Sequence, residues 1–478
     1  MKRFPKMLLL AMLALASASS LSSCEDNNDN APTQQEPSGP TDAAGRVILS
    51  GEISANRTLR ANEKYLLQGF VYVTNGTTLT IEPGTKIFGD QTTKGALIIE
   101  KGGKIIAEGT QANPIVFTSA KAPGSRNYGD WGGLVLVGNA PINRSTTATE
   151  MEGGIRGNFG GSNAADNSGS LKYVRIEFAG IPLSTTANSE INGLTMYGVG
   201  SGTQIDYVQV SYSGDDSYEW FGGTVNAKHL IAYRGFDDDF DTDFGYTGKV
   251  QYGLSLRDPQ FADQSGSNGF ESDNFNPGTP ATSDFNGLPL TAPVFSNMSV
   301  FVTGGTPPAT QQSGSGVYQS ALHLRRNTST SVYNSVFVGY PEGLRLDGTP
   351  TWANVQSGGL NLAGVVLANT TRPLRAANNT GSGAFTDADV ETWFNATGKN
   401  NSVVNAAGLS SLGLNTNTFT LTGPNFLLNS GSPLLSGAVF TGKADDSFFE
   451  KVTYRGAFNG STNWAQGWTN FDPQTTTY

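Results

Sequence analysis

Apolar and polar residues alternate along several segments of the chain that resemble one another. Residues Leu171–Gly180, Ile205–Gly214 and Phe295–Gly304 align without gaps, and in each one apolar residues recur at alternate positions before a closing glycine. Alternation with a period of two is typical of β-strands that bury one face. Similar strands are expected near three further positions, Leu230, Val336 and Val365.

A shorter repeat predicts turns between strands near the start of the chain. Glu82–Ile87 recurs as Glu100–Ile105, and each copy follows alternating apolar residues. Gly84 and Gly102 can supply the positive φ that such turns often need. Short strands that return at intervals of about 20 residues are typical of a parallel β-helix, in which each coil stacks on the last. The sequence therefore predicts an all-β solenoid, and a multi-sheet sandwich is the alternative.

One stretch departs from the strand pattern. Thr386–Phe394 starts like a capping box, carries acidic residues in its first turn, and places Val390, Trp393 and Phe394 at helical spacing. We expect a short helical insertion there. From about residue 380 onward we expect a region that caps the solenoid, because an uncovered terminal coil would expose its strand edges.

The beginning of the chain has the organisation of an export signal. Basic residues precede the apolar run Met7–Ala16, which is too short to span a bilayer as a mature helix. Leu21–Ser23 then leads to Cys24, the only cysteine, in the order of a lipobox. The sequence predicts a lipoprotein signal peptide over residues 1–23 and a lipid anchor on Cys24. An ordinary secretory signal with a chance cysteine is the alternative.

Residues 24–45 are polar, contain proline and have few apolar side chains, so they predict a disordered tether. Residues 46–478 then form a single β-helix domain. The run Glu25–Asn30 resembles the acidic export signal that sends lipoproteins to the outer face in one group of Gram-negative bacteria. We therefore expect a lipid-anchored outer-membrane protein that faces the cell exterior; a tether that is merely polar is the alternative.

Composition and net charge argue against some classes of binding partner. The chain of 478 residues has 60 glycines and a formal net charge of −10, and loss of the three basic residues of the signal peptide takes this to about −13. This charge argues against binding of nucleic acid or of anionic surfaces. No other stretch is apolar and long enough to cross a membrane, so we expect membrane contact through the lipid alone.

The densest charged pattern lies between Gly214 and Asn274, where an aromatic residue followed by an acid recurs on segments expected to be neighbouring coils. If Phe240 and Phe270 point inward, alternation places the acids that follow them on the outer face. The predicted metal ligands are Asp237, Asp238, Asp239, Asp241, Asp243, Glu271 and Asp273, with Asp215, Asp216 and Glu219 as additional acidic candidates.

Coils of a β-helix are about 4.8 Å apart. Carboxylates at that spacing repel one another and raise each other's pKa unless a cation lies among them. Ca²⁺ accepts six to eight oxygens in irregular geometry, so it is the cofactor that this pattern favours. A solvated acidic edge on an acidic protein is the alternative.

Several motifs are similar to the coils of right-handed β-helix lipoproteins, and the resemblance covers nearly all of the mature chain. The motifs are Leu79–Thr85, Gly109–Thr118, Asp130–Leu136, the acidic coils, Tyr454–Phe458 and Trp464–Trp468. This family is mostly uncharacterised, so the resemblance implies a fold and a location more than an activity. At the level of the superfamily, the implied right-handed parallel β-helix resembles pectate lyases.

The resemblance raises the possibility of catalysis. Calcium-dependent pectate lyases use a lysine or arginine as base, and the candidates in or beside the acidic coils are Lys228, Arg234, Lys249 and Arg257. Glycosidases with paired carboxylates are another enzyme class on this fold, and Asp215-Asp216 and Asp241-Thr242-Asp243 faintly match that pattern. The Gly-His-Gly and Arg-x-Lys elements of polygalacturonases are absent.

Histidines and tryptophans add little to a catalytic interpretation. His229 aligns with Tyr207 in the repeat, which predicts a coil side chain, and His323 lies on an alternating strand where we expect it to face solvent. Trp131, Trp220, Trp464 and Trp468 could stack on sugar rings, but aromatic side chains of a solenoid core or cap are commoner.

Three functions fit the sequence. The first is a surface module that binds extracellular polysaccharide, because long solenoids present extended faces to chain-like ligands. The second is a calcium-dependent polysaccharide lyase, or a hydrolase. The third is a structural or accessory lipoprotein of an outer-membrane complex. We favour the first, because no complete catalytic signature is present.

Overall fold

The computed structural model describes residues 38–147, 150–181, 190–263, 265–274, 285–308 and 316–478. Residues from Gly39 onward form one compact unit. The predicted signal peptide (1–23), Cys24 and the tether up to residue 37 lie outside the described residues. Within the described ranges, no helix is both long and apolar enough to cross a membrane.

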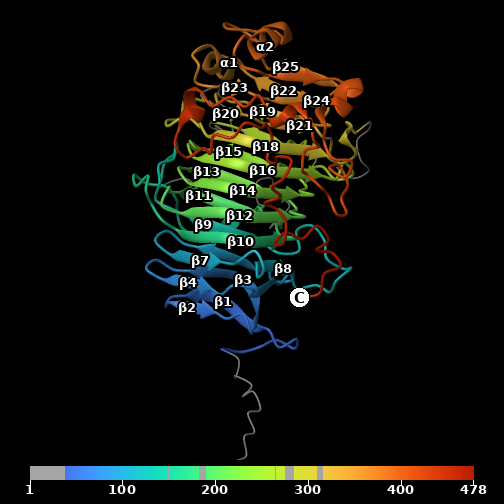
Figure 1. Ribbon diagram of the computed structural model, residues 1–478. Coiled ribbons are helices and arrows are strands. Elements are labelled where there is room, and N and C mark those ends of the chain that lie inside the picture. Colours follow the sequence, from blue (N-terminus) through green and yellow to red (C-terminus); the bar gives the residue numbers. More distant parts are fainter. Residues whose placement is uncertain (1–37, 148–149, 182–189, 264, 275–284, 309–315) are drawn as a thin grey trace, which may run out of the picture. The chain divides into compact units, whose positions relative to one another are not determined.

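The compact unit is a right-handed parallel β-helix, as the sequence predicted. All pairings between its named strands are parallel, and each strand inside the stack pairs with strands of the coils before and after it. Figure 1 shows the coils stacked from β1 and β2 at one end to β24 and β25 at the other. Three sheets, here named A, B and C in the order that the chain visits them within one coil, run along the stack.

The strands of sheet A are β6 (Ala96–Ile99), β9 (Gly133–Val137), β11 (Leu194–Val199), β13 (Tyr218–Gly223), β15 (Phe240–Asp243), β17 (Phe270–Ser272), β19 (Ser320–Leu324), β22 (Glu342–Asp347) and β25 (Arg372–Ala377). Sheet B contains β2 (Arg57–Leu59), β4 (Thr78–Ile81), β7 (Lys104–Glu108), β20 (Ser331–Tyr333) and β23 (Leu362–Ala363). Sheet C contains β5 (Lys86–Gly89), β8 (Ile115–Ser119), β21 (Val336–Val338), β24 (Val366–Ala368) and β26 (Ser402–Val404).

Longer strands bend from one sheet into the next. Those that join sheets B and C are β10 (Gly169–Glu177), β12 (Gln204–Ser211), β14 (Asn226–Tyr233), β16 (Lys249–Arg257) and β18 (Val294–Val302). Those that join C and A are β1 (Val47–Ile53) and β3 (Lys64–Val73). The three aligned repeats of the sequence correspond to β10, β12 and β18, and Leu171 pairs with Ile205 as the alignment requires.

The bend between sheets B and C carries a row of stacked rings. Tyr173, Tyr207, His229 and Tyr252 occupy it in successive coils, each with a positive φ between 50° and 66°. Such φ values are uncommon outside glycine, and stacking at centroid distances of 4.4, 4.2 and 5.0 Å accompanies them here. The prediction that His229 is a coil side chain is therefore confirmed.

Most strands of sheet C are buried on both faces, whereas the alternation predicted one; the terminal strand β26 is an exception. Their inner side chains fill the solenoid core, and outer ones such as Ile231, Leu254 and Phe301 are covered by apolar residues from the C-terminal part of the chain. In Figure 1 this segment, coloured red, returns along the side of the coils to end beside β8. Burial on two faces explains why β16 and β18 contain almost no exposed residue.

Two α-helices and five 3₁₀ turns occur among the described residues. The predicted helix is confirmed as α2 (Asp387–Phe394), with a complete capping box between Thr386 and Asp389, and it packs on β25 of the last full coil. The sequence did not predict α1 (Thr349–Gln356). The 3₁₀ turns are η1 (Glu152–Gly154), η2 (Thr303–Gly305), η3 (Ala406–Leu412), η4 (Pro433–Leu435) and η5 (Gly442–Asp445).

Candidate functional site

The acidic repeats enter sheet A on adjacent coils, as predicted. Tyr218, Phe240 and Phe270 stack in register and are buried in the core. The next positions along the strands, Glu219 and Asp241, therefore pair on the outer face. The aromatic residue holds the strand in the core and so fixes the side on which each acid appears.

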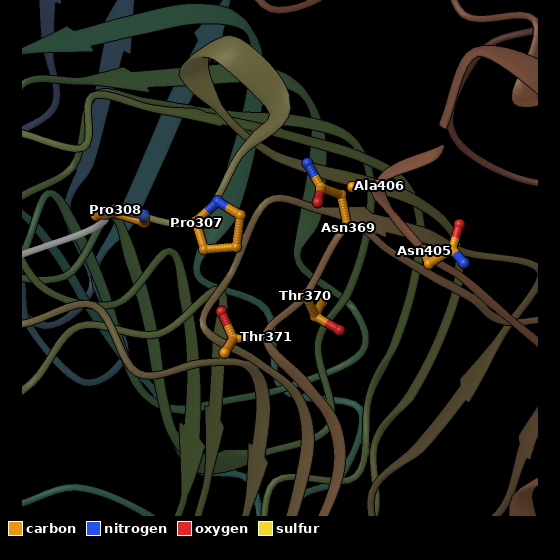
Figure 2. Close-up of a pocket in the computed structure, with 7 residues that line it drawn as sticks. All are labelled: Pro307, Pro308, Asn369, Thr370, Thr371, Asn405 and Ala406. Atoms are coloured by element: carbon orange, nitrogen blue, oxygen red, sulfur yellow. The ribbon is translucent and has the colours of Figure 1, made fainter. Parts of the chain in front are cut away.

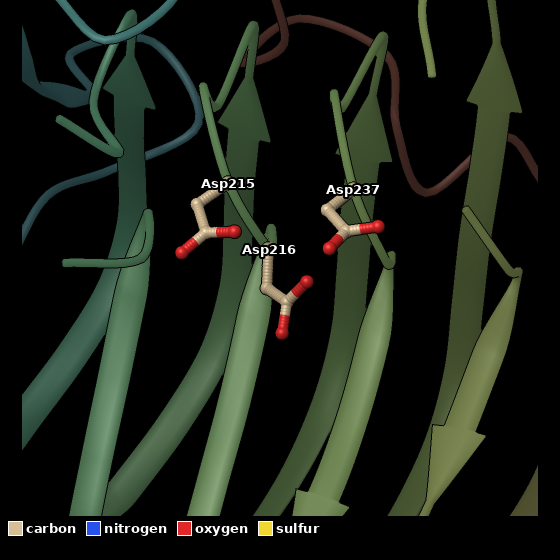
Figure 3. Close-up of side chains that lie close together, drawn as sticks. All are labelled: Asp215, Asp216 and Asp237. Carbon is tan, nitrogen blue, oxygen red and sulfur yellow. The ribbon is translucent and has the colours of Figure 1, made fainter. Parts of the chain in front are cut away.

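Two groups of three carboxylates form where these strands begin, and they share Asp216. One group is Asp215, Asp216 and Asp237; the other is Asp216, Glu219 and Asp241. Within each group, one oxygen from each residue lies within 4.8 Å of the others. Figure 3 shows Asp215 and Asp216 on one turn and Asp237 on the neighbouring turn, with Asp216 between the other two. We call these five residues the acidic cluster.

Backbone and amide donors orient part of the cluster. Asp216 Oδ1 accepts a hydrogen bond of 2.8 Å from the amide of Asp238. Asn192 accepts from the amide of Asp216 and donates its side-chain N–H to Glu219. By contrast, the Oδ1 atoms of Asp237 and Asp241 are buried without a hydrogen-bond partner. A buried carboxylate oxygen without a donor is costly, so these two atoms are suited to an additional ligand.

Burial and mutual repulsion disfavour the charged forms of the cluster. Desolvation, together with neighbouring carboxylates, raises the pKa of Asp215 to about 8. The same causes raise the pKa of Asp216, Glu219 and Asp241 well above the usual range for carboxyl groups. A cation among these side chains would reverse the effect, because it favours the ionised form that the burial opposes.

The donor set fits Ca²⁺. Calcium ligands lie 2.3–2.6 Å from the ion, so two oxygens on opposite sides of one ion are about 4.6–5.2 Å apart. The oxygens of each group, which lie within 4.8 Å of one another, can therefore contact a common ion. Calcium also needs six to eight oxygens, so a bound ion would need further ligands from water, from the second oxygens of these carboxylates or from an external molecule.

Two of the predicted metal ligands, Glu271 and Asp273, are neutralised by arginine side chains. Arg325 forms ion pairs with both Glu271 and Asp273, and Arg326 pairs with Asp273. Burial opposes ionisation of Glu271, but Arg325 and His323 outweigh it and lower its pKa to about 2. Glu271 pairs in register with Asp241 on the outer face, as predicted, but Glu271 and Asp273 share Arg325 as a partner and Asp273 also has Arg326.

The prediction that His323 faces solvent is wrong. Its ring is 4% exposed and lies between two carboxylates, with Nδ1 3.3 Å from Glu271 and Nε2 3.2 Å from Asp347. Burial opposes protonation, but the two carboxylates outweigh it and raise the pKa of His323 above its usual value. The residue faces outward from sheet A as alternation requires, and neighbouring coils cover it.

Asp239, also predicted as a metal ligand, does not lie on the outer face with the others. Asp239 is fully buried inside the solenoid, where it lies 3.4 Å from Arg257 and accepts a hydrogen bond from Ser255. Burial raises its pKa to about 6, against the lowering effect of Arg257. The turn before β15 breaks the alternation, so Asp239 and Phe240 both point inward although they are adjacent.

The two remaining predicted ligands border the cluster. Asp238 accepts hydrogen bonds from the backbone and side chain of Asn268, and burial with the nearby Glu271 raises its pKa to about 7. Asp243 accepts a 2.6 Å hydrogen bond from the amide of Phe244, and burial raises its pKa as well. Both acids therefore extend the crowded, buried acidic surface beside the five carboxylates, where burial disfavours the charged forms.

Sequence reasoning missed Glu152 at this site. It lies in η1, a turn in the connection between β9 and β10, and its amide donates a hydrogen bond of 3.0 Å to the hydroxyl of Tyr197. Burial raises its pKa, with Asp215 and Asp243 among the charges that contribute. Glu152 belongs to no repeat, so only the folded connection brings it near the cluster.

None of the four basic residues predicted as catalytic candidates faces the cluster. Each pairs with a different acid: Lys228 with Glu450, Lys249 with Asp446, Arg234 with Asp258, and Arg257 with Asp239. Arg325 and Arg326, which follow β19, pair instead with Glu271 and Asp273, and Arg325 also interacts with Asp241 of the cluster. The strand β18 and the long segments on either side of it separate these arginines from the acidic repeats in sequence and so concealed the relation.

The tryptophans are structural. Trp131 and Trp220 are fully buried in the core and Trp468 is 1% exposed. Trp464 is half-buried and stacks on Phe458 with a centroid distance of 4.8 Å. The three buried rings pack within the protein, as the sequence indicated, and are not available to stack on a sugar.

A pocket of about 380 Å³ lies further along the corner between sheets C and A. Its lining is uncharged, and Figure 2 shows it between η2, the turn before β25 and the segment after β26. The lining residues are Pro307, Pro308, Asn369, Thr370, Thr371, Asn405 and Ala406. Because turns at this corner also carry Asp215 and Asp237, the pocket and the cluster lie on the same edge of the solenoid.

The fold and site define a class of protein: a right-handed parallel β-helix with a carboxylate cluster on its outer face. The sequence matches the family described as a pectate-lyase-like β-helix domain over residues 51–469, so the chain belongs to that family. No curated protein matches the chain, and neither does any solved structure.

Proposed function

We propose that the protein is a lipid-anchored surface module that binds acidic extracellular polysaccharide through Ca²⁺ held by the acidic cluster. The observation that carries this proposal is the pair of buried, unpartnered oxygens on Asp237 and Asp241 within two groups of carboxylates that share Asp216. Calcium would satisfy these oxygens. Its remaining coordination positions would accept a carboxylate of the ligand.

The surroundings of the cluster suit a chain-like anionic ligand. The cluster, the arginines after β19 and the uncharged pocket follow one another along the solenoid, whose coils repeat at about 4.8 Å. Arg326 can donate to a carboxylate or sulfate group of a ligand. A polysaccharide that runs along the stack would therefore meet calcium, then cationic, then neutral polar positions.

The anchor and the location complete the proposal. The lipobox at Cys24 and the acidic residues that follow it support attachment to the outer membrane, with the solenoid facing the exterior. At that position the protein would meet polysaccharide before it reaches the cell.

Affinity electrophoresis of the mature protein through gels that contain polygalacturonate or alginate tests this function. We expect retardation in millimolar Ca²⁺, loss of retardation with a calcium chelator, and no retardation by neutral dextran. Asp216→Asn with Asp241→Asn should migrate freely, whereas Asp445→Asn, which changes an exposed acid paired with Lys451, should behave as wild type. Calcium binding without retardation would contradict polysaccharide binding and favour a structural role for the ion.

A lyase is the second candidate, and one observation favours it. Arg326 lies close enough to Asp243 to lower its pKa, so a guanidinium stands beside the carboxylates that would bind calcium. Arginine serves as base in calcium-dependent lyases of similar fold. Incubation with polygalacturonate or alginate should then yield unsaturated products that absorb in the ultraviolet, and Arg326→Ala should abolish them. Absence of such products from wild-type protein would exclude these substrates.

A further inference from the structure

The C-terminal part of the chain covers the outer face of sheets B and C without joining either sheet. We define residues 423–478 as the strap; all of it is described, and it contains no strand and only the short turns η4 and η5. The strap contacts coils from β20 back to β3, since Val439 bonds to Asn334 and Tyr478 bonds to Lys64. It therefore runs across the stacked coils rather than along one of them.

Buried side-chain amides of the coils bind the strap backbone in pairs. Gln209 donates to the carbonyl of Asn470 at 2.8 Å and accepts from its amide at 2.9 Å. Gln251 makes the same two bonds with Glu450, both at 2.9 Å. These contacts use only main-chain atoms of the strap, so they do not depend on its side chains.

Asn334 repeats this arrangement with Val439, with bonds of 3.1 and 2.6 Å. Asn297 donates to the carbonyls of Tyr454 and Gly456. All four amides are fully buried. Neighbouring antiparallel strands hold each other through pairs of main-chain hydrogen bonds to single residues. Here buried side-chain amides of the coils make the equivalent pairs of hydrogen bonds to the strap.

Apolar and charged anchors fix the register of the strap. Trp468 lies 5.9 Å from the rings of both Tyr173 and Tyr207, in edge-on orientation. Glu450 pairs with Lys228 at 2.7 Å. Arg126 donates to the carbonyls of Pro473 and Thr476, and Tyr478 donates to Glu177 at 2.6 Å.

We propose that the outer face of sheets B and C is a peptide-binding surface for an extended segment, that the strap occupies it in cis, and that the strap of a second copy can occupy it in trans. The paired amides supply main-chain recognition, and the aromatic row at the bend supplies pockets for the anchors. This surface is independent of the acidic cluster on sheet A.

The test uses the full chain with a protease site inserted between Thr422 and Gly423, an exposed position where an added Cβ would meet nothing within 4 Å. After cleavage, we expect the strap to co-elute with the coils in size-exclusion chromatography. A fluorescent peptide of residues 423–478 should then exchange into the cleaved protein, while the uncleaved protein takes up none.

The matched variants separate amide recognition from simple burial. Gln209→Ala with Gln251→Ala should release the strap after cleavage about tenfold faster or more, because it removes four hydrogen bonds. Gln204→Ala changes an exposed amide on the same strand, β12, and should behave as wild type. Immediate loss of the wild-type strap on cleavage, failure of the peptide to exchange, or equal retention by the double variant would overturn the proposal. If the double variant does not fold, exchange into the cleaved wild type decides.

Discussion

At the scale of single residues, neighbouring aspartates in this protein have opposite roles. Asp239 is an internal partner of Arg257, whereas Asp241 belongs to the outer cluster and keeps an unpartnered oxygen. The sequence predicted the outward position of Asp241 from its place after Phe240. It could not predict Asp239, because the residue lies in a turn where strand alternation does not hold.

Replacement of these two residues should therefore change stability in opposite directions when calcium is absent. Asp239→Asn leaves the buried guanidinium of Arg257 without its charge partner, which we expect to cost about 3–5 kcal/mol. Asp241→Asn removes one repelling carboxylate and should raise the stability of the calcium-free protein. Urea denaturation in the presence of chelator measures both changes, and a loss of stability in Asp241→Asn would contradict the electrostatic account of the cluster.

The stability of the calcium-free protein should fall as the pH rises. The folded-state pKa values of Asp215 and Asp238 are raised to about 8 and about 7, while the same aspartates in the unfolded chain titrate near their ordinary value of 3.8. Groups with raised folded pKa values contribute stability that is fully present below about pH 4 and is lost as the pH rises toward 8. Carboxyl groups with lowered folded pKa values, such as Glu271 and Asp347 at about 2, make stability rise with pH only below about pH 4, so they do not oppose this trend.

Calcium should reverse this trend, because it binds the ionised carboxylates and competes with protons. Melting temperatures measured from pH 5 to 8, with calcium and with chelator, test this prediction. We expect the increase caused by calcium to be small at pH 5 and largest at pH 8. An increase that does not depend on pH would contradict binding at the cluster.

At the scale of elements, the sequence predicted strands well where one coil follows another directly. Leu171 and Ile205 align in sequence and pair in the structure. The sequence failed where a long connection intervenes: Glu271 pairs with His323, 52 residues later, across such a connection. It also failed for the strap, because a segment without alternation gives no periodic signal and its contacts are to side chains.

The strap should contribute substantially to the stability of the coils beneath it. Trp468 is almost fully buried against Tyr173 and Tyr207, so Trp468→Ala should lower the free energy of unfolding by about 3–5 kcal/mol. As a control within a helix, Thr386→Ala removes the cap of α2 and should cost only about 1 kcal/mol. If both variants unfold at the wild-type denaturant concentration, the strap is not part of the cooperative unit.

At the scale of the whole molecule, composition and repeats were sufficient to predict the fold class, because every coil of a solenoid repeats the same pattern of strands and turns. The acidic cluster was only partly predictable. The repeats identified the acids, but Glu152 and the arginines after β19 reach the site through connections that carry no repeat. The proposed polysaccharide is a separate molecule, so its chemical class is inferred from the side chains of the acidic cluster and its surroundings.

The proposed attachment to the membrane depends on one residue of the whole chain, Cys24. Cys24→Ala should abolish incorporation of an alkyne-labelled fatty acid and release the protein from the membrane fraction or halt its processing, because the chain contains no other cysteine. Fractionation and labelling in the native host measure this. Fatty-acid labelling of the alanine variant would contradict the anchor.

The central claim is that the carboxylate cluster on sheet A binds calcium, and the melting temperature of the mature protein at pH 8 tests it most directly. A ligand that binds only the folded form stabilises it by about 2.7 kcal/mol at a hundredfold excess over its dissociation constant. We predict that chelator lowers the melting temperature by several degrees, that calcium restores it, and that Asp216→Asn with Asp241→Asn removes the response while Asp445→Asn retains it. A wild-type melting temperature that is the same in chelator and in calcium would contradict the claim.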